Sequence, residues 1–328
     1  MKRKPPPQPL PHPEGNHQSR LDDAARAGWL YYVAGNTQDE IARKLKVSRP
    51  TAQRLVALSL AERLISFRLE HPIAACMELS AALTDRYDLA YCEVAPSDPE
   101  SDSIFLGSAE RTAAFLEQRL RTPDPLVVAI GTGRTLRAAV ERMEGMSCPQ
   151  HRFVSLVGHI SMRGSASFYD VLAQLSSLTQ APHYPMPLPV VVPTRDQRDQ
   201  LMQLEPVMRV LELGAAADIT LIGIGRMDES APLYVDGFIS KEELTEIRKL
   251  GAVGEVTGWA YDAAGHIISG GFNERLTSVP RTVPPEQLVV GAAQGTGKVL
   301  PIHAALRGRI VNGLITNETT ARSLLALR

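Results

Sequence analysis

Seven short apolar runs, separated by segments with helical spacing, constrain the fold of this chain more than any other feature. The runs are LAYCEV, PLVVAIG, RFVSLVG, LPVVV, ITLIGIG, QLVVGAA and RIVNGLI, spread over residues 89–315. Continuous apolar strands that alternate with helices are typical of a parallel sheet covered by helices on both faces. The sequence therefore predicts an α/β domain with a Rossmann-like parallel sheet, interrupted by a hairpin around residues 262–265 in GWAYDAAGHIISGG.

A helix-turn-helix pattern precedes this domain, in TQDEIARKLKVSRPTAQRL. Thr37 and Glu40 have the spacing of a capping box, and Ser48 can cap the following helix, where Pro50 is tolerated in the first turn. The turn between the two helices falls at Lys46, where glycine is common. A positive φ at this lysine would cost on the order of 1 kcal/mol.

One face of the second helix is polar and suited to reading base edges in a major groove. The alternative is a helical hairpin whose charged face meets only water. Residues 1–70 carry twelve Lys and Arg against seven Asp and Glu, whereas the whole chain has a net charge of −1, which favours a polyanionic partner for this end. The expected DNA-binding residues are Thr37, Gln38, Ser48, Arg49, Thr51, Gln53 and Arg54.

Composition and periodicity divide the chain into three parts. The proline-rich, polar start cannot bury enough surface to offset chain entropy, so we expect a disordered tail there. Helical spacing begins at Leu21 and continues to near Gly35. The expected parts are a tail over 1–20, an all-α helix-turn-helix domain over 21–70 with a wing-like strand at 64–69, and the α/β domain over 71–328, which opens with a linking helix at 72–87.

Several classes of protein are disfavoured by the composition. The three cysteines are scattered without a C-x-x-C motif, so neither a disulfide framework nor a zinc site is indicated, and we expect no metal and no cofactor. No apolar stretch reaches the length of a membrane span, and the basic start lacks the apolar segment of a secretory signal. These features predict a cytoplasmic protein without membrane contact.

The segment LVVAIGTGRTLRAAV predicts a strand, a tight loop and a helix that together can bind an anion. Gly131 and Gly133 permit close backbone approach, and Thr132 and Thr135 offer hydroxyl groups. A plain strand-to-helix turn that needs glycine only for its geometry is the competing interpretation. A dinucleotide site is disfavoured, because Leu136 stands where the third glycine would be required.

A second loop, QGTGK, resembles the end of a phosphate-binding P-loop but lacks two of its residues. Ala292 stands at the position of the first glycine and Val299 at that of the hydroxyl residue, which argues against an ATP site. Lys298 follows the carboxyl end of a predicted strand, where open parallel sheets bind ligands, and can offer a charge to a phosphate. Glu255 in AVGEVTGW is suited to accepting hydrogen bonds from sugar hydroxyls. For both residues, simple surface exposure is the alternative.

From about residue 21 to 328 the chain resembles the SorC/DeoR-type sugar-binding transcriptional regulators. The resemblance rests on WLYYVAGNTQDEIARKLKVSRPTAQRL, AIGTGRT, LIGIG, VGEVTGWAYDAAGHII and GKVLPIHAALRGRIVNGLITNETTARSLL, in this order. It implies an effector domain similar to sugar-phosphate isomerases and assembly into dimers or tetramers on operator DNA. It also implies that Gly133, Arg134 and Thr135 contact phosphate, that Glu255 contacts hydroxyls, and that Lys298 contacts phosphate again.

The chain departs from the family pattern at three places. Lys46 replaces the turn glycine, Asn317 replaces an aspartate, and residues 157–159 offer no arginine for a second phosphate, which disfavours a bisphosphate effector. The expected function is regulation of a carbohydrate or polyol catabolic operon by a small phosphorylated sugar or polyol, and not an enzymatic activity. The alternative is a sugar-phosphate isomerase or deaminase-like enzyme with a helical appendage, which would need Glu255, Asp262 or Lys298 as general acid and base.

Overall fold

The computed structural model describes residues 13–62, 64–65, 73–97, 106–158, 160–161, 164, 171–279 and 287–327. The chain divides into two compact units, 1–70 and 71–328, which we call unit 1 and unit 2. The division falls between the helix-turn-helix pattern and the expected linking helix at 72–87.

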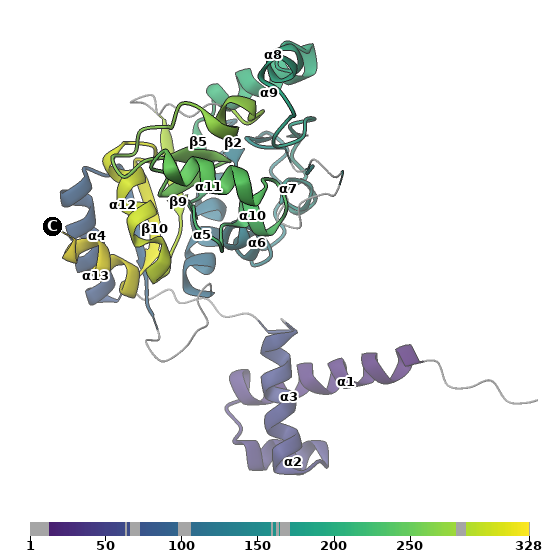
Figure 1. Ribbon diagram of the computed structural model, residues 1–328. Helices are drawn as coiled ribbons and strands as arrows, with labels where there is room; N and C mark the ends of the chain where they lie inside the picture. Colours follow the sequence, from purple (N-terminus) through teal and green to yellow (C-terminus); the bar gives the residue numbers. More distant parts are fainter. Residues whose placement is uncertain are drawn as a thin grey trace, which may run out of the picture. The chain divides into compact units, whose positions relative to one another are not determined.

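The regular elements among the described residues of unit 1 are helices (Figure 1). Its elements are α1 (Pro13–Gly28), the short π-helix η1 (Trp29–Val33), α2 (Gln38–Leu45) and α3 (Arg49–Ala61). Both α1 and α2 pack against α3, and the core contains Ala24, Ala27, Ile41, Ala52 and Val56. The small residues let the helix backbones approach closely. A Cβ atom on Gly28 would meet the side chain of Ser59 on α3.

The predicted caps and turn are present in the helix-turn-helix. The Thr37 hydroxyl accepts from the Glu40 amide, and the Glu40 carboxylate accepts from the Thr37 amide at 2.8 Å, which completes the capping box. The Ser48 hydroxyl caps α3 by accepting from the Thr51 amide at 3.3 Å. Lys46 ends α2 with a φ of 54°, so a lysine occupies the left-handed position that favours glycine.

The expected disordered tail is wrong for residues 13–20, because α1 begins at Pro13. Packing of Ala24 and Ala27 in the core with α3 stabilises this helix, and each residue added to a formed helix gains a hydrogen bond at low entropic cost. A proline in the first turn loses no intrahelical bond. Residues 1–12 lie outside the described part, as does most of the expected strand at 64–69, of which only Leu64 and Ile65 are described, in a bend.

Unit 2 contains a seven-stranded parallel sheet, as expected for an α/β domain. The strands follow the order β1-β10-β9-β5-β2-β3-β4, and every neighbouring pair is parallel. Their bounds are β1 (Tyr91–Ala95), β2 (Val127–Ile130), β3 (Arg152–Ser155), β4 (His183–Tyr184), β5 (Ile219–Gly223), β9 (Leu288–Ala292) and β10 (Gly313–Asn317). A second, antiparallel sheet has the order β6-β7-β8, with β6 (Gly225–Arg226), β7 (Gly254–Val256) and β8 (Trp259–Tyr261).

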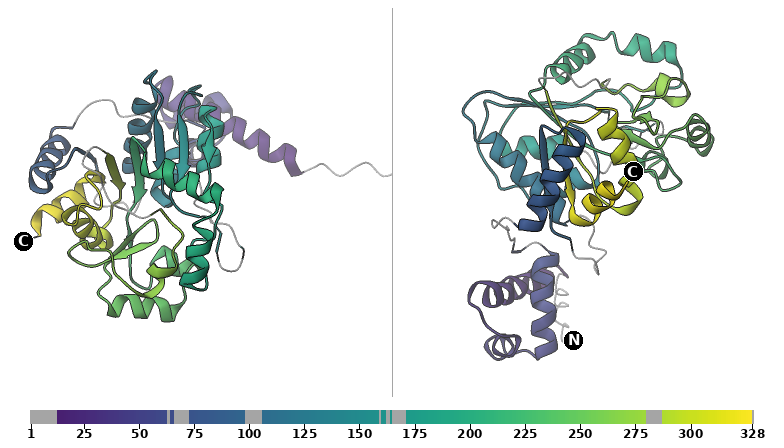
Figure 2. Two further views of the ribbon diagram at one scale, coloured as in Figure 1. Left: turned by 90° about the horizontal axis from the view of Figure 1, so that it is seen from above. Right: turned by 90° about the vertical axis from the view of Figure 1, so that its left-hand side faces the viewer.

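Helices cover both faces of the large sheet (Figure 2). One face packs against α4 (Ala74–Tyr87), α9 (Glu205–Ala215), α12 (Val299–Arg307) and α13 (Glu318–Ala326), and the other against α5 (Leu106–Leu120), α6 (Arg134–Val140) and α7 (Leu172–Thr179). Successive strand residues alternate between the two cores: Val154 packs in the first and Phe153 in the second. Burial on both faces explains why the strands read as continuous apolar runs.

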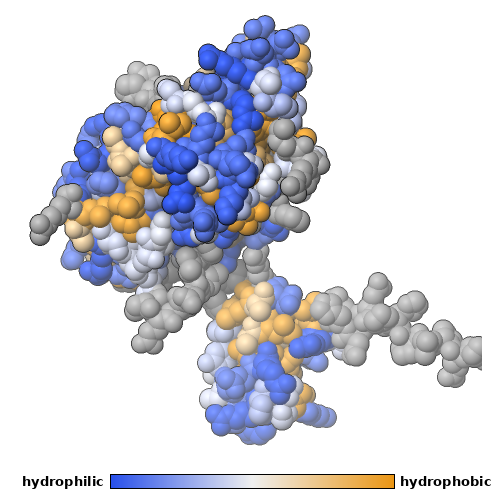
Figure 3. Space-filling model, in the orientation of Figure 1, coloured by the Kyte–Doolittle hydropathy of each residue, from blue (hydrophilic) through white to orange (hydrophobic). Residues whose placement is uncertain are grey.

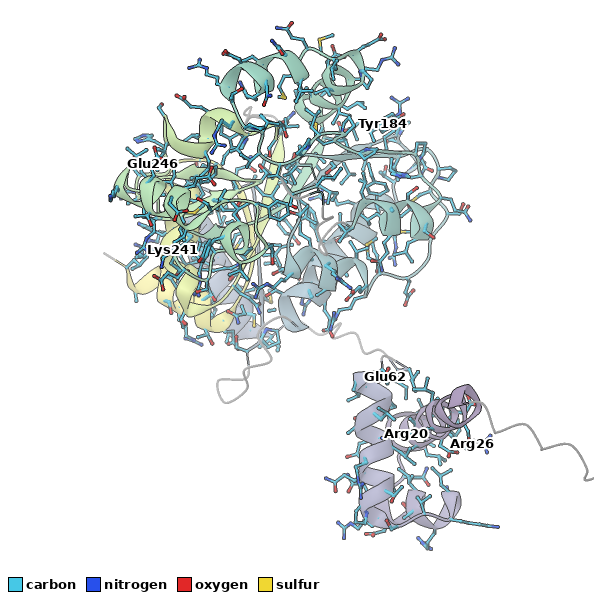
Figure 4. The ribbon with its side chains drawn as sticks, turned by 45° about the vertical axis from the view of Figure 1, so that its right-hand side comes forward. Arg20, Arg26, Glu62, Tyr184, Lys241 and Glu246 are labelled. Carbon is cyan, nitrogen blue, oxygen red and sulfur yellow. The ribbon has the colours of Figure 1, made fainter. Side chains whose placement is uncertain are left out.

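A third apolar cluster lies beside the antiparallel sheet. It includes α11 (Lys241–Lys249), whose Leu244 and Ile247 are buried while Lys241 and Glu246 are exposed (Figure 4). The remaining elements are α8 (Arg195–Leu201), α10 (Pro232–Val235) and the 3₁₀ helices η2 (Gly271–Arg275) and η3 (Thr296–Lys298). Within the described residues, no helix is both long and apolar enough to cross a bilayer.

Two strand predictions need correction. The run at Leu188–Val192 forms only isolated bridges, because Pro187 and Pro189 have no N–H to donate to a ladder, and β4 is formed by His183–Tyr184 instead. The run ITLIGIG divides between β5 and β6, so its last residues leave the parallel sheet. The expected hairpin is present, since the Asp262 amide donates to the His266 carbonyl at 3.0 Å.

Candidate functional site

A cavity of about 360 Å³ lies at the carboxyl ends of the central parallel strands in unit 2. Loops that follow β2, β3, β5 and β9 line it, together with β7 and the segment around α10. Open parallel sheets bind ligands at this edge, so the position agrees with the expectation from the sequence. Of the seven expected effector-binding residues, six line the cavity: Thr132, Gly133, Arg134, Thr135, Glu255 and Lys298.

Gly131 is the expected residue that does not line the cavity. It lies at the end of β2, where its amide donates to the Leu221 carbonyl at 2.9 Å. A Cβ atom there would lie 3.2 Å from the Ile222 side chain and 3.3 Å from that of Thr257. The structure therefore gives Gly131 a packing role directly behind the loop.

The Thr132–Thr135 loop presents one wall of the cavity. Gly133 has a φ of 138° and is the N-cap residue of α6, and no side chain caps this helix. Uncapped amide groups at a helix start remain available to a ligand or to water. Arg134 is exposed at this position, whereas Thr135 is buried.

Lys298 and Glu255 reach the cavity from η3 and β7. Burial lowers the pKa of Lys298 to about 8, with Glu255 acting against the decrease and Arg134 and Arg226 adding to it. Burial raises the pKa of Glu255, while the Gly258 amide, which donates to its carboxylate at 2.9 Å, and Lys298 act in the opposite direction. The two groups therefore influence each other electrostatically inside one cavity.

Glu255 depends on a glycine in the neighbouring strand. Gly225 pairs with Glu255 across β6 and β7, and a Cβ atom on Gly225 would overlap the Glu255 carboxylate. The sequence motif LIGIG therefore supplies space for this side chain, a requirement that only the pairing of the two strands reveals.

Six polar lining residues were not expected from the sequence: Arg226, Ser230, Asp236, Thr257, Gln294 and Thr296. Arg226 follows β5 closely and forms an ion pair with Asp228 at 3.1 Å between Nε and Oδ1. Asp236 ends α10, and burial raises its pKa against the opposing influence of Arg134. Thr257 has a φ of 48° and a buried hydroxyl with no hydrogen-bond partner among the described residues, which marks a strained position beside the cavity. Arg226 could have been predicted as a lining residue, because it directly follows the apolar run ITLIGIG. No local sequence pattern predicts this role for Asp236.

The cavity carries both signs of charge. Three cationic side chains line it against two carboxylates, and Arg226 is already paired with Asp228. No group of three or more potential metal ligands occurs in the described part of the chain. The arrangement suits a small ligand that has an anionic group and several hydroxyls, because charge-assisted hydrogen bonds are available to both.

The second candidate surface is the exposed face of α3 in unit 1. Arg49, Gln53 and Arg54 are exposed, while Leu55 and Val56 on the opposite side are buried. Arg49 lies 3.5 Å from Asp39, measured from Nε to Oδ1, and both side chains are mostly exposed. On the face of unit 1 in Figure 3, hydrophilic side chains gather over α2.

The other expected DNA-binding residues have structural roles as well. The hydroxyls of Thr37 and Ser48 cap α2 and α3, and the hydroxyls of Ser48 and Thr51 lie 2.8 Å apart. Gln38 is the first residue of α2 and is half-buried. The structure thus brings the seven residues together on α2, α3 and the turn between them.

Comparison with known proteins covers both units. A model of a sugar-binding domain family matches residues 71–326. The erythritol catabolism regulatory protein EryD of Brucella abortus (strain 2308) is 34% identical over 302 residues, which cover 92% of this chain and 96% of that protein. The transcriptional regulator LsrR of Enterobacter sp. (strain 638) is 30% identical over 318 residues, with 92% of each chain covered.

A solved structure has a similar fold. The full-length sorbitol operon regulator SorC from Klebsiella pneumoniae has a TM-score of 0.68 at 22% identity, over 93% of this chain and 98% of its own. Identity at this level supports the fold, and the family follows from the domain match and the more similar relatives. The chain therefore belongs to the SorC/DeoR-type sugar-binding transcriptional regulators, and it is a regulator rather than an enzyme.

Proposed function

We propose that this regulator binds operator DNA through α3 and that a phosphorylated sugar or polyol, bound in the cavity of unit 2, controls this binding. The observation that carries the proposal is that six residues expected from the sequence to contact an effector line one cavity. The sugar-binding domain match covers unit 2 and leaves unit 1, with its helix-turn-helix, for the DNA contact that a transcriptional regulator needs.

The DNA-binding half of the proposal rests on α3. Arg49 and Arg54 can donate bidentate hydrogen bonds to guanine or contact phosphates, and Gln53 can pair with adenine. These three side chains are exposed, and a buried stripe holds the helix in place behind them. Thr37, Gln38, Ser48 and Thr51, near the starts of α2 and α3, are suited to positioning contacts with the phosphate backbone.

The effector half rests on the two loops that face the cavity. The Thr132–Thr135 loop offers amides and hydroxyls to a phosphate, and Lys298 and Arg134 supply charge. Glu255 accepts hydrogen bonds from hydroxyls of the same ligand. The names of the Brucella and Klebsiella proteins refer to erythritol catabolism and to a sorbitol operon, which supports a polyol-related operon for this chain too.

We also propose that the protein acts as a homo-oligomer, either a dimer or a tetramer. A single helix-turn-helix reads only a short site, so useful specificity requires paired modules on half-sites about 34 Å apart or a multiple of that spacing. Self-association would supply this pairing.

The proposal is tested by measuring DNA binding of a triple variant, Arg49→Ala, Gln53→Ala and Arg54→Ala. Each good base contact contributes roughly 1–3 kcal/mol, so losing three of them should reduce the preference for DNA from upstream of its operon over random DNA by about a hundredfold or more. The matched control is Arg20→Ala with Arg26→Ala, which removes two exposed cations from α1 in the same unit (Figure 4).

The control should weaken binding to both DNA samples equally, because it removes only sequence-independent attraction. Fluorescence anisotropy at fixed salt gives both affinities, and circular dichroism establishes that each variant is folded. An unchanged preference in a folded triple variant would show that α3 does not read the operator.

A further inference from the structure

Two carboxylates line the cavity, and they come from different elements. Glu255 is on β7, and Asp236 ends α10 on the segment between β6 and α11. Both lie outside the large sheet, whereas the Thr132–Thr135 loop and Lys298 follow its strands. A ligand in this cavity therefore meets cationic groups from the sheet edge and carboxylates from the elements beside it.

Asp236 is held in place by a packed turn. Leu233 before it and Ile239 after it are buried, at 9% and 4% exposure, in the cluster beside the antiparallel sheet. The amides of Phe238 and Ile239 donate to the Leu233 carbonyl at 2.9 and 3.0 Å. Gly237, which directly follows Asp236, adopts a φ of 76°. The backbone that carries this carboxylate therefore has little conformational entropy left to lose when a ligand binds.

The Asp236 carboxylate retains its capacity to accept hydrogen bonds. None of the described residues donates a hydrogen bond to it or forms an ion pair with it, although Arg134 influences it electrostatically. Partial burial of a carboxylate without protein partners is unfavourable, and ligand hydroxyls would relieve this cost. Because Asp236 is one of the lining residues, a ligand in the cavity can supply such donors.

The charges of the cavity come closer to compensating one phosphate group than two. Arg134, Arg226 and Lys298 exceed Asp236 and Glu255 by one positive charge, and Arg226 is in addition paired with Asp228. A phosphate monoester carries about −1.5 to −2 charges, and a bisphosphate roughly twice as much. The second phosphate would leave uncompensated negative charge close to two carboxylates.

We propose that Asp236 determines effector specificity: its carboxylate accepts hydrogen bonds from effector hydroxyls and restricts the cavity to a sugar or polyol with a single phosphate. This inference rests on the proposed function of the cavity as an effector site. It adds a second hydroxyl acceptor to Glu255, so that a chain of hydroxyls is bound between two carboxylates.

The experiment compares three kinds of probe by calorimetry with the full-length protein. They are inorganic phosphate, fructose 1,6-bisphosphate, and whichever of erythritol 4-phosphate, ribose 5-phosphate and glucitol 6-phosphate binds the wild type most tightly. In Asp236→Ala, the affinity for the monophosphate relative to inorganic phosphate should fall about tenfold or more, because a charged hydrogen-bond acceptor is lost. Inorganic phosphate and the bisphosphate should bind as well as before or better, because a negative charge has been removed.

Two further variants separate the role of Asp236 from a structural one. Asp236→Asn keeps the size and a carbonyl acceptor, so it should show the gain for the bisphosphate with a smaller loss for the monophosphate. Glu229→Gln removes an exposed carboxylate from the same segment that does not line the cavity, and it should leave all three affinities unchanged.

Equal losses for all three probes in Asp236→Ala would overturn the inference, because they would mean that the side chain only supports the cavity. Unchanged ratios would overturn it as well. If the wild type binds the monophosphate in a way that depends on Lys298 while the ratios stay unchanged, the proposed function stands and only the role of Asp236 is lost. If the wild type binds none of the probes, both are wrong.

Discussion

The two candidate surfaces of this regulator are assembled in different ways. The residues that we expect to bind DNA lie within eighteen consecutive positions, 37–54, on two helices and their flanking turns. The cavity takes its residues from separate segments between positions 132 and 298, which the strand order β9-β5-β2-β3 brings to one edge. A local surface follows from helical periodicity, whereas a cavity at a sheet edge requires the topology of the whole domain.

The two regions also differ in what they require of the fold. Arg49, Gln53 and Arg54 are exposed to water, so their presence places little demand on the packing of unit 1. Burial shifts the pKa values of Lys298 and Glu255 away from their ordinary values, in the direction of the neutral forms. Unit 2 therefore keeps a partly unfavourable arrangement of charges, as is common at functional sites.

The substitution with the strongest expected consequence tests whether the two units fold independently of each other. Ala52 is fully buried between the helices of unit 1, so Ala52→Asp should place an unpaired charge in its core and cost on the order of 4 kcal/mol. This is a large share of the stability of so small a unit, and operator affinity should fall more than a hundredfold. Binding of a sugar phosphate to unit 2, measured by calorimetry, should be unchanged.

The matched control for this test is Ala57→Asp, on an exposed position of the same helix. Its thermal unfolding should stay close to that of the wild type. A loss of effector binding in Ala52→Asp would show that the two units do not fold independently.

A second test asks whether Lys298 contacts the phosphate group of a ligand in the cavity. Lys298→Ala should weaken a phosphorylated effector about ten- to a hundredfold, because a charge-assisted contact to phosphate contributes roughly 1.5–3 kcal/mol. The unphosphorylated form should lose much less, and DNA binding without effector should be nearly unchanged. Lys241→Ala, on the exposed face of α11, serves as the control. Equal losses for both ligand forms would mean that Lys298 contacts hydroxyls or only shapes the cavity.

The pH dependence of binding provides a separate check on Lys298. Its pKa of about 8 in the free cavity means that the amine is mostly protonated near about pH 7 and mostly neutral near about pH 9. A phosphate monoester keeps its charge over this range, because its second pKa is about 6. Affinity should therefore be highest below about pH 8 and decrease above it, by up to about tenfold per pH unit. A decrease that persists in Lys298→Ala would assign the effect to another group.

A small change in the free energy of unfolding is expected from a substitution in the turn of unit 1. Lys46 has a left-handed backbone, so Lys46→Gly should raise the free energy of unfolding by up to about 1 kcal/mol. Ala57→Gly on α3 should lower it by about 0.5–1 kcal/mol, because glycine disfavours an exposed helix interior. Chemical denaturation of the two variants measures both changes. A destabilised Lys46→Gly variant would mean that contacts of the lysine side chain outweigh the backbone strain.

The fold of each unit could be predicted largely from local patterns. Thr37, Glu40 and Ser48 identify the starts of two helices, because capping depends on residues only three positions apart. The apolar runs identify most strands of the large sheet for a similar reason, since burial on both faces leaves a continuous signal. The segment at Leu188–Val192 shows the limit of this signal, because it is buried and apolar without being a strand.

The helix-turn-helix, most strands of the parallel sheet, and the two loops with Thr132–Thr135 and Lys298 could be predicted from the sequence alone. Each of them is encoded by residues close together in the chain. Only the tertiary structure decided that Arg226 and Asp236 join these loops around one cavity, and that Gly131 lies behind it. The physical reason is that charge, burial and hydrogen-bonding capacity in a cavity depend on which strands are neighbours. Strand order results from the packing of the whole domain, and no short segment carries it.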